Sequence, residues 1–196
     1  MKNTILLFTG IILVSLLLIF LIPGIKDSWT LDKDKFLSGE YWRIVSYPFV
    51  HLSWSHLIEN MVGLALVGFI AFELKTRSFD YALAYFSTAI LAILPLWIIV
   101  NFTALGSSAA VYGLFGFISL GIAKFGLKIN HLILLVVVII FGRSVYSIIY
   151  GESISYYLIQ SLAHFSGFVF GLAAFFALER VEGQLNKKKQ FILRGG

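Results

Sequence analysis

Residues 81–123 read YALAYFSTAILAILPLWIIVNFTALGSSAAVYGLFGFISLGIA and contain no charged side chain. One α-helix of these 43 residues would be about 65 Å long, roughly twice the thickness of a bilayer core. The segment is therefore expected to turn back, and Asn101–Ser108, with its Gly106-Ser107-Ser108 run, carries the turn signal. A turn without charge is predicted to lie inside the membrane boundary, where only protein or a water-filled cavity makes it tolerable.

The composition of the whole chain agrees with this reading. Of its 196 residues, 59% are hydrophobic and only 13% are charged, whereas soluble domains carry about 25% charged residues. The chain is therefore predicted to be one polytopic, all-α membrane domain over residues 1–196, and not a soluble enzyme, a nucleic-acid-binding protein or a disordered chain. The absence of cysteine excludes disulfides, thiolate nucleophiles and cysteine-ligated metals.

Apolar segments on both sides of residues 81–123 add further spans. Counting two spans within that stretch, the second of them Ser108–Ala123, the sequence predicts six transmembrane helices. The other four are Thr4–Ile22, His56–Phe72, Ile129–Tyr150 and Tyr157–Leu178.

The distribution of basic residues predicts the orientation of these spans. With the N-terminus inside, ten Lys and Arg residues fall on the inner side and five on the outer side. This bias predicts that both termini are cytoplasmic and that the long loop 25–55 faces outward. The basic tail, 179–196, is expected to meet anionic lipid through Lys187–Lys189. His131 is expected at the inner interface and Arg143 at the outer one.

Ser108 stands at the predicted junction of a loop and a helix. Gly106 before it permits a tight turn that exposes a hydroxyl, and free backbone N–H groups at a helix start can hold an oxyanion. This pattern fits a serine nucleophile. The competing interpretation is that Ser107 or Ser108 is an N-cap of the helix.

His164 lies early in the sixth predicted span, and alone it fits a packing residue as well as a base. Gly167 and Gly171 follow it in the small-xxx-small pattern that lets two helices approach closely. A close approach of this helix to the fourth span would bring His164 within hydrogen-bond reach of Ser108. Tyr112, four residues after Ser108, shares its helix face and is placed to stack on the imidazole.

His56 and Asn60 are also four residues apart, so they share one face of the second span. Aimed at the Ser108 hydroxyl, both could donate hydrogen bonds to a developing oxyanion. The alternative is that they only hold helices together by hydrogen bonds. A metal site of His51, His56 and His164 is the weaker reading, because no spacing here matches a known zinc motif.

Four short motifs together resemble the rhomboid family of intramembrane serine proteases, in order and in their placement on the spans. They are Tyr41-Trp42-Arg43, His51–Asn60 (HLSWSHLIEN), Gly106–Ala109 (GSSA) and Ala163–Gly167 (AHFSG). The resemblance extends from about Lys26 to Arg180 and implies a six-helix rhomboid-like bundle. Ala109 stands where glycine is commonest in the family, and it is small enough to keep the turn.

The resemblance implies a catalytic dyad without an aspartate. Ser108 would be the nucleophile, His164 the general base, and Tyr112 would pack on that base. The fifth span and the loop after it would form a gate that admits the substrate helix.

The resemblance also implies supporting roles around the dyad. His56 and Asn60 would form the oxyanion hole with backbone N–H groups of Ser108 and Ser107, after the turn at Gly106. Trp42 and Arg43 would structure the outer loop, and Glu73 would anchor its surroundings from the end of the second span. Glu59 has three readings: a neutral buried carboxyl, a partner of Arg43 or a histidine, or a group facing loop water.

The expected function is that of an intramembrane serine endopeptidase. It would cleave single-span membrane proteins in or next to their transmembrane helix, near the outer face of a prokaryotic inner membrane, with the lipid bilayer as its other partner. No cofactor, metal or nucleic acid is expected, and the oligomeric state is left open.

Three other readings stay open. One is a catalytically silent rhomboid-like protein that binds transmembrane helices. A second is a small transporter or channel, although the sequence has no internal repeat. The third is a subtype: the HLSWSH run and the compact length are similar to rhombosortases.

Overall fold

The computed structural model describes residues 4–123 and 154–194, together with Leu134, Val138, Val145 and Ile149. Regular structure in this part of the chain is helical, apart from an isolated bridge between Leu31 and Ala104. The predicted fifth span, with His131, Arg143 and the expected gate, otherwise lies outside the described residues.

Five long helices carry the apolar segments, and the sequence predicted a span on each of them. Three are long and apolar enough to cross a membrane, through Trp54–Glu73, Ser78–Ile99 and Tyr157–Val181, among the described residues. The helical membrane class is therefore confirmed, while the number of six spans and the side of the termini stay predictions. The long helices are α1 (Thr4–Phe20), α5 (Trp54–Glu73), α6 (Ser78–Ile99), α7 (Ser108–Ala123) and α9 (Ile154–Arg194).

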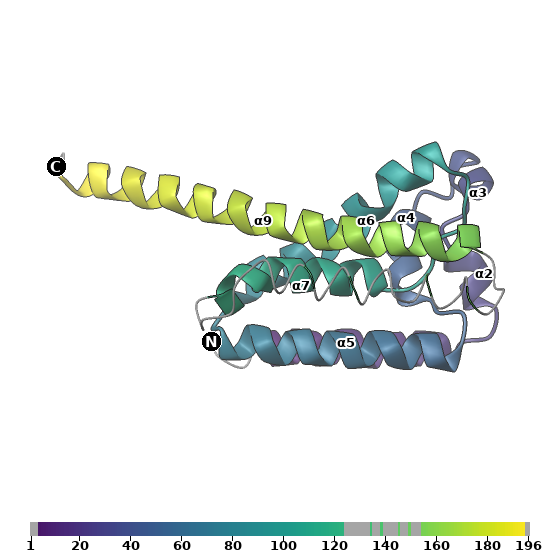
Figure 1. Ribbon diagram of the computed structural model, residues 1–196. Helices are drawn as coiled ribbons and strands as arrows, with labels where there is room; N and C mark the ends of the chain where they lie inside the picture. Colours follow the sequence, from purple (N-terminus) through teal and green to yellow (C-terminus); the bar gives the residue numbers. More distant parts are fainter. Residues whose placement is uncertain are drawn as a thin grey trace.

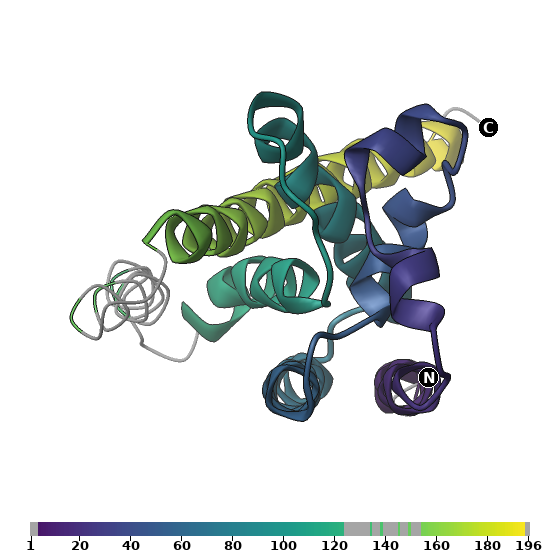
Figure 2. The same cartoon turned by 90° about the vertical axis from the view of Figure 1, so that its right-hand side faces the viewer.

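Helix α7 occupies the centre of the bundle. It packs against α5, α6 and α9, and Figure 1 shows it running between α5 and α9. Figure 2 shows α1 and α5 side by side along one edge. The first residues of α7 and α9 lie at the same end of the molecule (Figure 1), so their N-terminal side chains can meet there.

Glycines bring α7 and α9 into direct backbone contact. A Cβ built on Gly171 would lie 1.8 Å from the carbonyl oxygen of Gly113, and one on Gly116 would lie 2.0 Å from that of Phe168. No side chain fits in such a gap, so the small-xxx-small pattern has the packing role that the sequence predicted. This contact fixes how α7 and α9, and the side chains that they carry, lie relative to each other.

The predicted outer loop, 25–55, is ordered by short helices and by its own buried side chains. Its elements are α2 (Ile25–Trp29), α3 (Lys33–Leu37), α4 (Arg43–Ser46) and the 3-10 helix η1 (Tyr47–Phe49). Leu31 and Tyr47 of this loop are almost fully buried in one cluster with Trp97, Ala109 and Ala163. Since Ala109 and Ala163 adjoin Ser108 and His164, the loop packs directly against the predicted site.

Helix α9 continues beyond the predicted sixth span. The sequence predicted a span to Leu178 and then a tail, whereas the helix runs on to Arg194 and projects from the bundle (Figure 1). Residues 179–194 contain no proline, and Glu, Gln, Leu, Lys and Arg have high helix propensity. The change from apolar to charged residues therefore ends the apolar segment but not the helix.

Candidate active site

Ser108 and His164 form a hydrogen-bonded pair. The Ser108 Oγ lies 2.8 Å from His164 Nε2, and the two residues come from α7 and α9. Ser108 is half-buried and His164 is 9% exposed. This distance is within the range in which a base accepts the proton of a nucleophilic hydroxyl.

The turn at Gly106 sets the start of α7. Gly106 has φ +97°, a backbone conformation that side chains disfavour, and its N–H donates to the Tyr47 carbonyl at 3.0 Å. A Cβ on Gly106 would also lie 2.7 Å from His56 Nε2. Glycine is therefore required at position 106 for two reasons. It permits the positive φ of the turn, and it leaves room for the imidazole of His56. Ser107, directly after it, is fully buried.

Tyr112 fixes the plane of the His164 imidazole. The two rings are stacked with centroids 4.6 Å apart and planes inclined by 25°. Tyr112 lies one turn after Ser108 on α7, so one helix presents both the hydroxyl and the surface on which its partner ring rests. The stack restricts rotation of the imidazole and keeps Nε2 directed at Ser108.

A cavity of about 560 Å³ opens beside this pair. The outer loop, the segment before α7 and the first turns of α9 contribute its walls. It is large enough for several residues of a peptide in extended form. The residues that line it are Asp32, Lys33, Asp34, Tyr47, Leu52, His56, Ile93, Asn101, Phe102, Thr103, Ala104, Leu105, Gly106, Ser108, Ala109, Ile159, Gln160, Ala163 and His164.

His56 and Asn60 approach the same turn from α5. His56 lines the cavity, while Asn60 is 5% exposed and donates its amide Nδ2 to the His56 carbonyl at 2.9 Å. The Asn60 Nδ2 lies 3.7 Å from the Cβ position of Gly106. An amide nitrogen has two hydrogens, and this bond engages one of them. Both side chains thus stand near the turn that leads into Ser108.

The outer loop is held by Arg43, which is buried although charged. Its Nη1 donates to the carbonyls of Asp27 and Thr30 at 3.0 and 2.7 Å, and its Nε donates to Glu40 Oε2 at 2.7 Å. Arg43 therefore joins α2 to the segment before α4. Trp42 is half-exposed and places its ring nitrogen 3.4 Å from the Ser28 carbonyl oxygen.

Glu73 lies far from this loop. It is the last residue of α5, and the 20 residues of that helix put it about 30 Å from Trp54 at the loop end. Its side chain borders a different cavity. The structure thus separates Glu73 from the loop that it was expected to anchor. Glu59, in the second turn of α5, is exposed.

His51 is 2% exposed, and its ring contacts that of His56. The two imidazoles meet edge to face, with centroids 4.9 Å apart. Burial lowers the pKa of His51 to about 3, and the nearby His56 acts in the same direction. His51 is therefore a neutral packing partner for His56. In the part of the chain that the structure describes, no three His, Asp or Glu side chains are grouped to hold a metal ion.

We expect this histidine to make stability depend on pH. Unfolded histidine titrates near 6.5, so below that pH the unfolded chain binds a proton that the folded chain does not. The free energy of unfolding therefore falls as the pH decreases, by about 2 kcal/mol between pH 6.5 and 5. Titration with a denaturing detergent at several pH values should show this loss in wild type and not in His51→Gln. Equal pH dependence in both proteins would contradict it.

Several residues of the cavity were missed by the sequence analysis, among them Tyr47 and Gln160. Tyr47 donates its hydroxyl to the Ala89 carbonyl on α6, and burial raises the pKa of this hydroxyl, so it stays a donor. Its role could not be foreseen because it depends on how the outer loop folds. Gln160 lies four residues before His164 on α9. That spacing places both on one helix face and was a signal that could have found it.

Helices long and apolar enough to cross a membrane, with a partly buried serine–histidine pair beside a cavity, define an integral membrane protein. A family model described as Rhomboid domain matches residues 38–180. The chain therefore belongs to the rhomboid family.

A curated relative gives a weaker but consistent match. Rhomboid-like protein 11, chloroplastic, from Arabidopsis thaliana is 32% identical to this chain over 77 residues, which are 38% of this chain. The match covers 27% of that relative. The chain thus spans about a quarter of the relative that it matches.

Proposed function

We propose that this chain is an intramembrane serine endopeptidase that cleaves a peptide bond in or next to a transmembrane helix. The observation that carries the proposal is the 2.8 Å contact between Ser108 Oγ and His164 Nε2 beside a 560 Å³ cavity. Membership of the rhomboid family supports it. Hydrolysis of a peptide bond in a membrane needs water and an activated hydroxyl. The Ser108–His164 pair is suited to supply the hydroxyl, and the polar groups of the cavity are suited to hold the water.

In this proposal His164 transfers one proton in each of two steps at Ser108. The Ser108 oxygen attacks the scissile carbonyl carbon while His164 Nε2 accepts the hydroxyl proton. His164 then gives this proton to the leaving amine, which leaves an acyl group on Ser108. Water, deprotonated by His164, then attacks the acyl carbonyl carbon. The bond to the Ser108 oxygen breaks, the acid product leaves, and His164 returns the proton to the serine. Tyr112 keeps the imidazole oriented during both steps.

The oxyanion formed in each step needs donors, and three groups near the turn are suited to provide them. The backbone N–H of Ser108, at the start of α7, has no partner within the helix. His56 and Asn60 approach the same turn from α5. Removing one such donor typically costs about 2.7–4 kcal/mol of transition-state stabilisation.

We also propose on which side of which membrane the cavity lies. Six spans with cytoplasmic termini would place the cavity at the outer face, where single-span proteins would enter as substrates. A prokaryotic inner membrane is proposed as the location; the relative named chloroplastic belongs to a plant organelle. The positive-inside distribution of Lys and Arg supports this orientation.

Labelling with a fluorophosphonate probe tests the activated serine. Wild-type protein in detergent should be labelled, whereas Ser108→Ala and His164→Ala should not, because the first lacks the nucleophile and the second its base. Labelling that persists in Ser108→Ala would contradict the proposal. A folded wild type that resists the probe and still binds a transmembrane helix would favour the silent alternative.

A further inference from the structure

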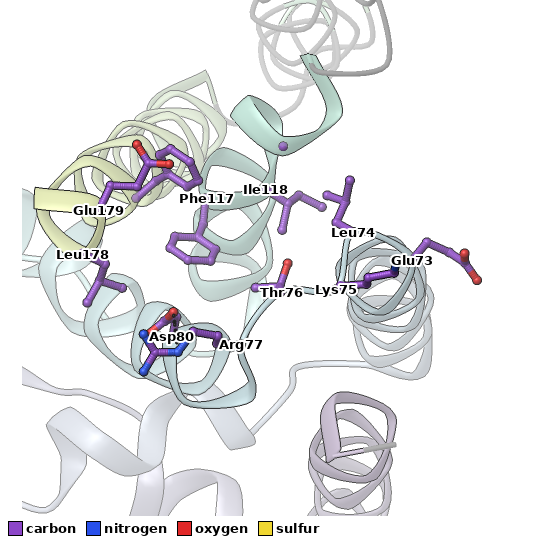
Figure 3. A pocket seen from close by; sticks show the side chains of 12 residues that line it. Glu73, Leu74, Lys75, Thr76, Arg77, Asp80, Phe117, Ile118, Leu178 and Glu179 are labelled. Atoms are coloured by element: carbon purple, nitrogen blue, oxygen red, sulfur yellow. Dashed lines mark ion pairs between the residues drawn. The ribbon is translucent and has the colours of Figure 1, made fainter. Parts of the chain in front are cut away.

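Buried polar side chains adjoin helix α7 at both of its ends. At the end away from Ser108, the joint between α5 and α6 meets α7 beside a cavity of about 410 Å³ (Figure 3). The buried carboxylate there has a partner, since Asp80 Oδ2 lies 3.6 Å from Arg77 Nε. At the other end, the hydroxyls of Ser107 and Tyr85 are fully buried, and neither completes a hydrogen bond among the described residues.

Ser107 occupies the N-cap position of α7 but does not use its side chain as a cap. Its carbonyl accepts from Val111 N at 3.0 Å, which is the first bond of the helix. An N-cap serine normally also accepts a first-turn N–H through its hydroxyl, as Ser53 does for α5, where its Oγ accepts from His56 N at 3.3 Å. The Ser107 Oγ makes no such bond to the described first turn of α7. The N–H groups of that turn therefore stay clear of this hydroxyl.

The Ser107 hydroxyl lies instead next to Tyr85 of α6. The two hydroxyls are close enough to interact, although they fall short of hydrogen-bond geometry. Tyr85 belongs to the buried cluster that contains Ala110 and Val111, near the start of α7. Its ring packs edge to face on Phe8 of α1, with centroids 6.2 Å apart, which limits its movement away from α7. Two adjoining buried hydroxyls are expected to bond to each other, because each is otherwise left unsatisfied.

On the basis of the function proposed above, we propose that Tyr85 is a positioning residue, which holds the Ser107 hydroxyl away from the start of α7. Backbone N–H groups at a helix start are directed at negative charge, and an oxyanion gains most from them when no side-chain oxygen occupies them. A Ser107 hydroxyl bonded to Tyr85 leaves these groups to the oxyanion that forms when Ser108 reacts. Without Tyr85, the hydroxyl turns to the first turn of α7, as N-cap serines do, and competes with that oxyanion.

The kinetics of Tyr85→Phe in two backgrounds, wild type and Ser107→Ala, test this inference. Hydrolysis of a single-span reporter is measured in proteoliposomes, per active site counted by complete fluorophosphonate labelling. In the wild-type background, Tyr85→Phe is expected to lower kcat about tenfold with KM unchanged, because it affects the oxyanion and not the bound substrate. In the Ser107→Ala background, the same change is expected to alter kcat less than about twofold, since no hydroxyl remains to be released.

Tyr81→Phe is the matched control. Tyr81 lies one turn earlier on α6, is also fully buried, and packs on the same Phe8 ring with centroids 5.9 Å apart. Its hydroxyl, however, accepts from Thr9 Oγ1 of α1 at 3.4 Å. Tyr81→Phe thus removes a buried tyrosine hydroxyl from the same helix without touching Ser107, and its kcat is expected to equal that of wild type.

Three outcomes would overturn the positioning role while leaving the proposed catalytic mechanism intact. They are a wild-type kcat in Tyr85→Phe, an equal loss of kcat from this change in both backgrounds, and the same loss in Tyr81→Phe. A purely structural role of Tyr85 would give an equal loss in both backgrounds, because the damage would not depend on the Ser107 hydroxyl. A folded wild type that does not react with the fluorophosphonate would instead contradict the proposed function, and the positioning role with it.

Discussion

Replacing Ser108 by alanine is expected to reduce the hydrolysis of a single-span reporter by at least about 10⁴-fold. The substitution removes the oxygen that lies 2.8 Å from His164 Nε2. It leaves the backbone N–H and the start of α7 in place, since alanine is at least as good a helix former as serine. The measurement is the rate of cleavage in proteoliposomes, at equal amounts of folded enzyme.

Ser119→Ala is the matched control for this prediction. Ser119 lies on the same helix, is 1% exposed, and donates its hydroxyl to the Phe115 carbonyl at 2.6 Å within α7. Its substitution makes the same chemical change far from the cavity, and activity should be that of the wild type. Cleavage by Ser108→Ala at the wild-type rate would rule out the proposed mechanism. Loss in both variants would point to damage of α7 instead of loss of a nucleophile.

The central helix could be predicted from the sequence because its signals are local. Ser108–Ala123 was predicted as a span, and α7 has the same bounds. The long uncharged stretch required a turn, and Gly106 marked it. The short helices of the outer loop could not be predicted in this way. Helices of four or five residues have no apolar period, and those of the loop are held by distant contacts such as that between Leu31 and Ala104.

The candidate site likewise contains residues that local sequence signals predicted and residues whose position depends on distant contacts. Ser108, Tyr112 and His164 could be brought together in advance because helix spacing and the glycines of α9 defined their faces. Tyr47 could not, because its place in the cavity depends on how the outer loop packs onto α6. Glu73 was predicted at the end of the second span, and α5 does end there. Its anchoring role came from the family resemblance alone, and the length of α5 places it far from the outer loop.

Gly171→Ala is expected to lower the free energy of unfolding by about 3 kcal/mol or more. The added Cβ would lie 1.8 Å from the Gly113 carbonyl oxygen and 2.9 Å from the Phe117 nitrogen. Both are backbone atoms of α7, so no side chain can rotate away, and the two helices must separate. The measurement is unfolding by a denaturing detergent, compared with wild type at the same pH.

Gly183→Ala is the control, because it makes the same change on the same helix with nothing within 4 Å of the added Cβ. Helix propensity predicts a gain there of up to about 1 kcal/mol. Similar effects at both positions would mean that α7 and α9 do not pack closely.

Gly167→Ala tests whether the contact between α7 and α9 also holds the serine–histidine pair together. Its Cβ would lie 2.4 Å from the carbonyl oxygen of Ala109, the residue after Ser108. If glycine contacts hold the pair together, this variant loses fluorophosphonate labelling even where it still folds, because separation of the helices draws His164 away from the serine.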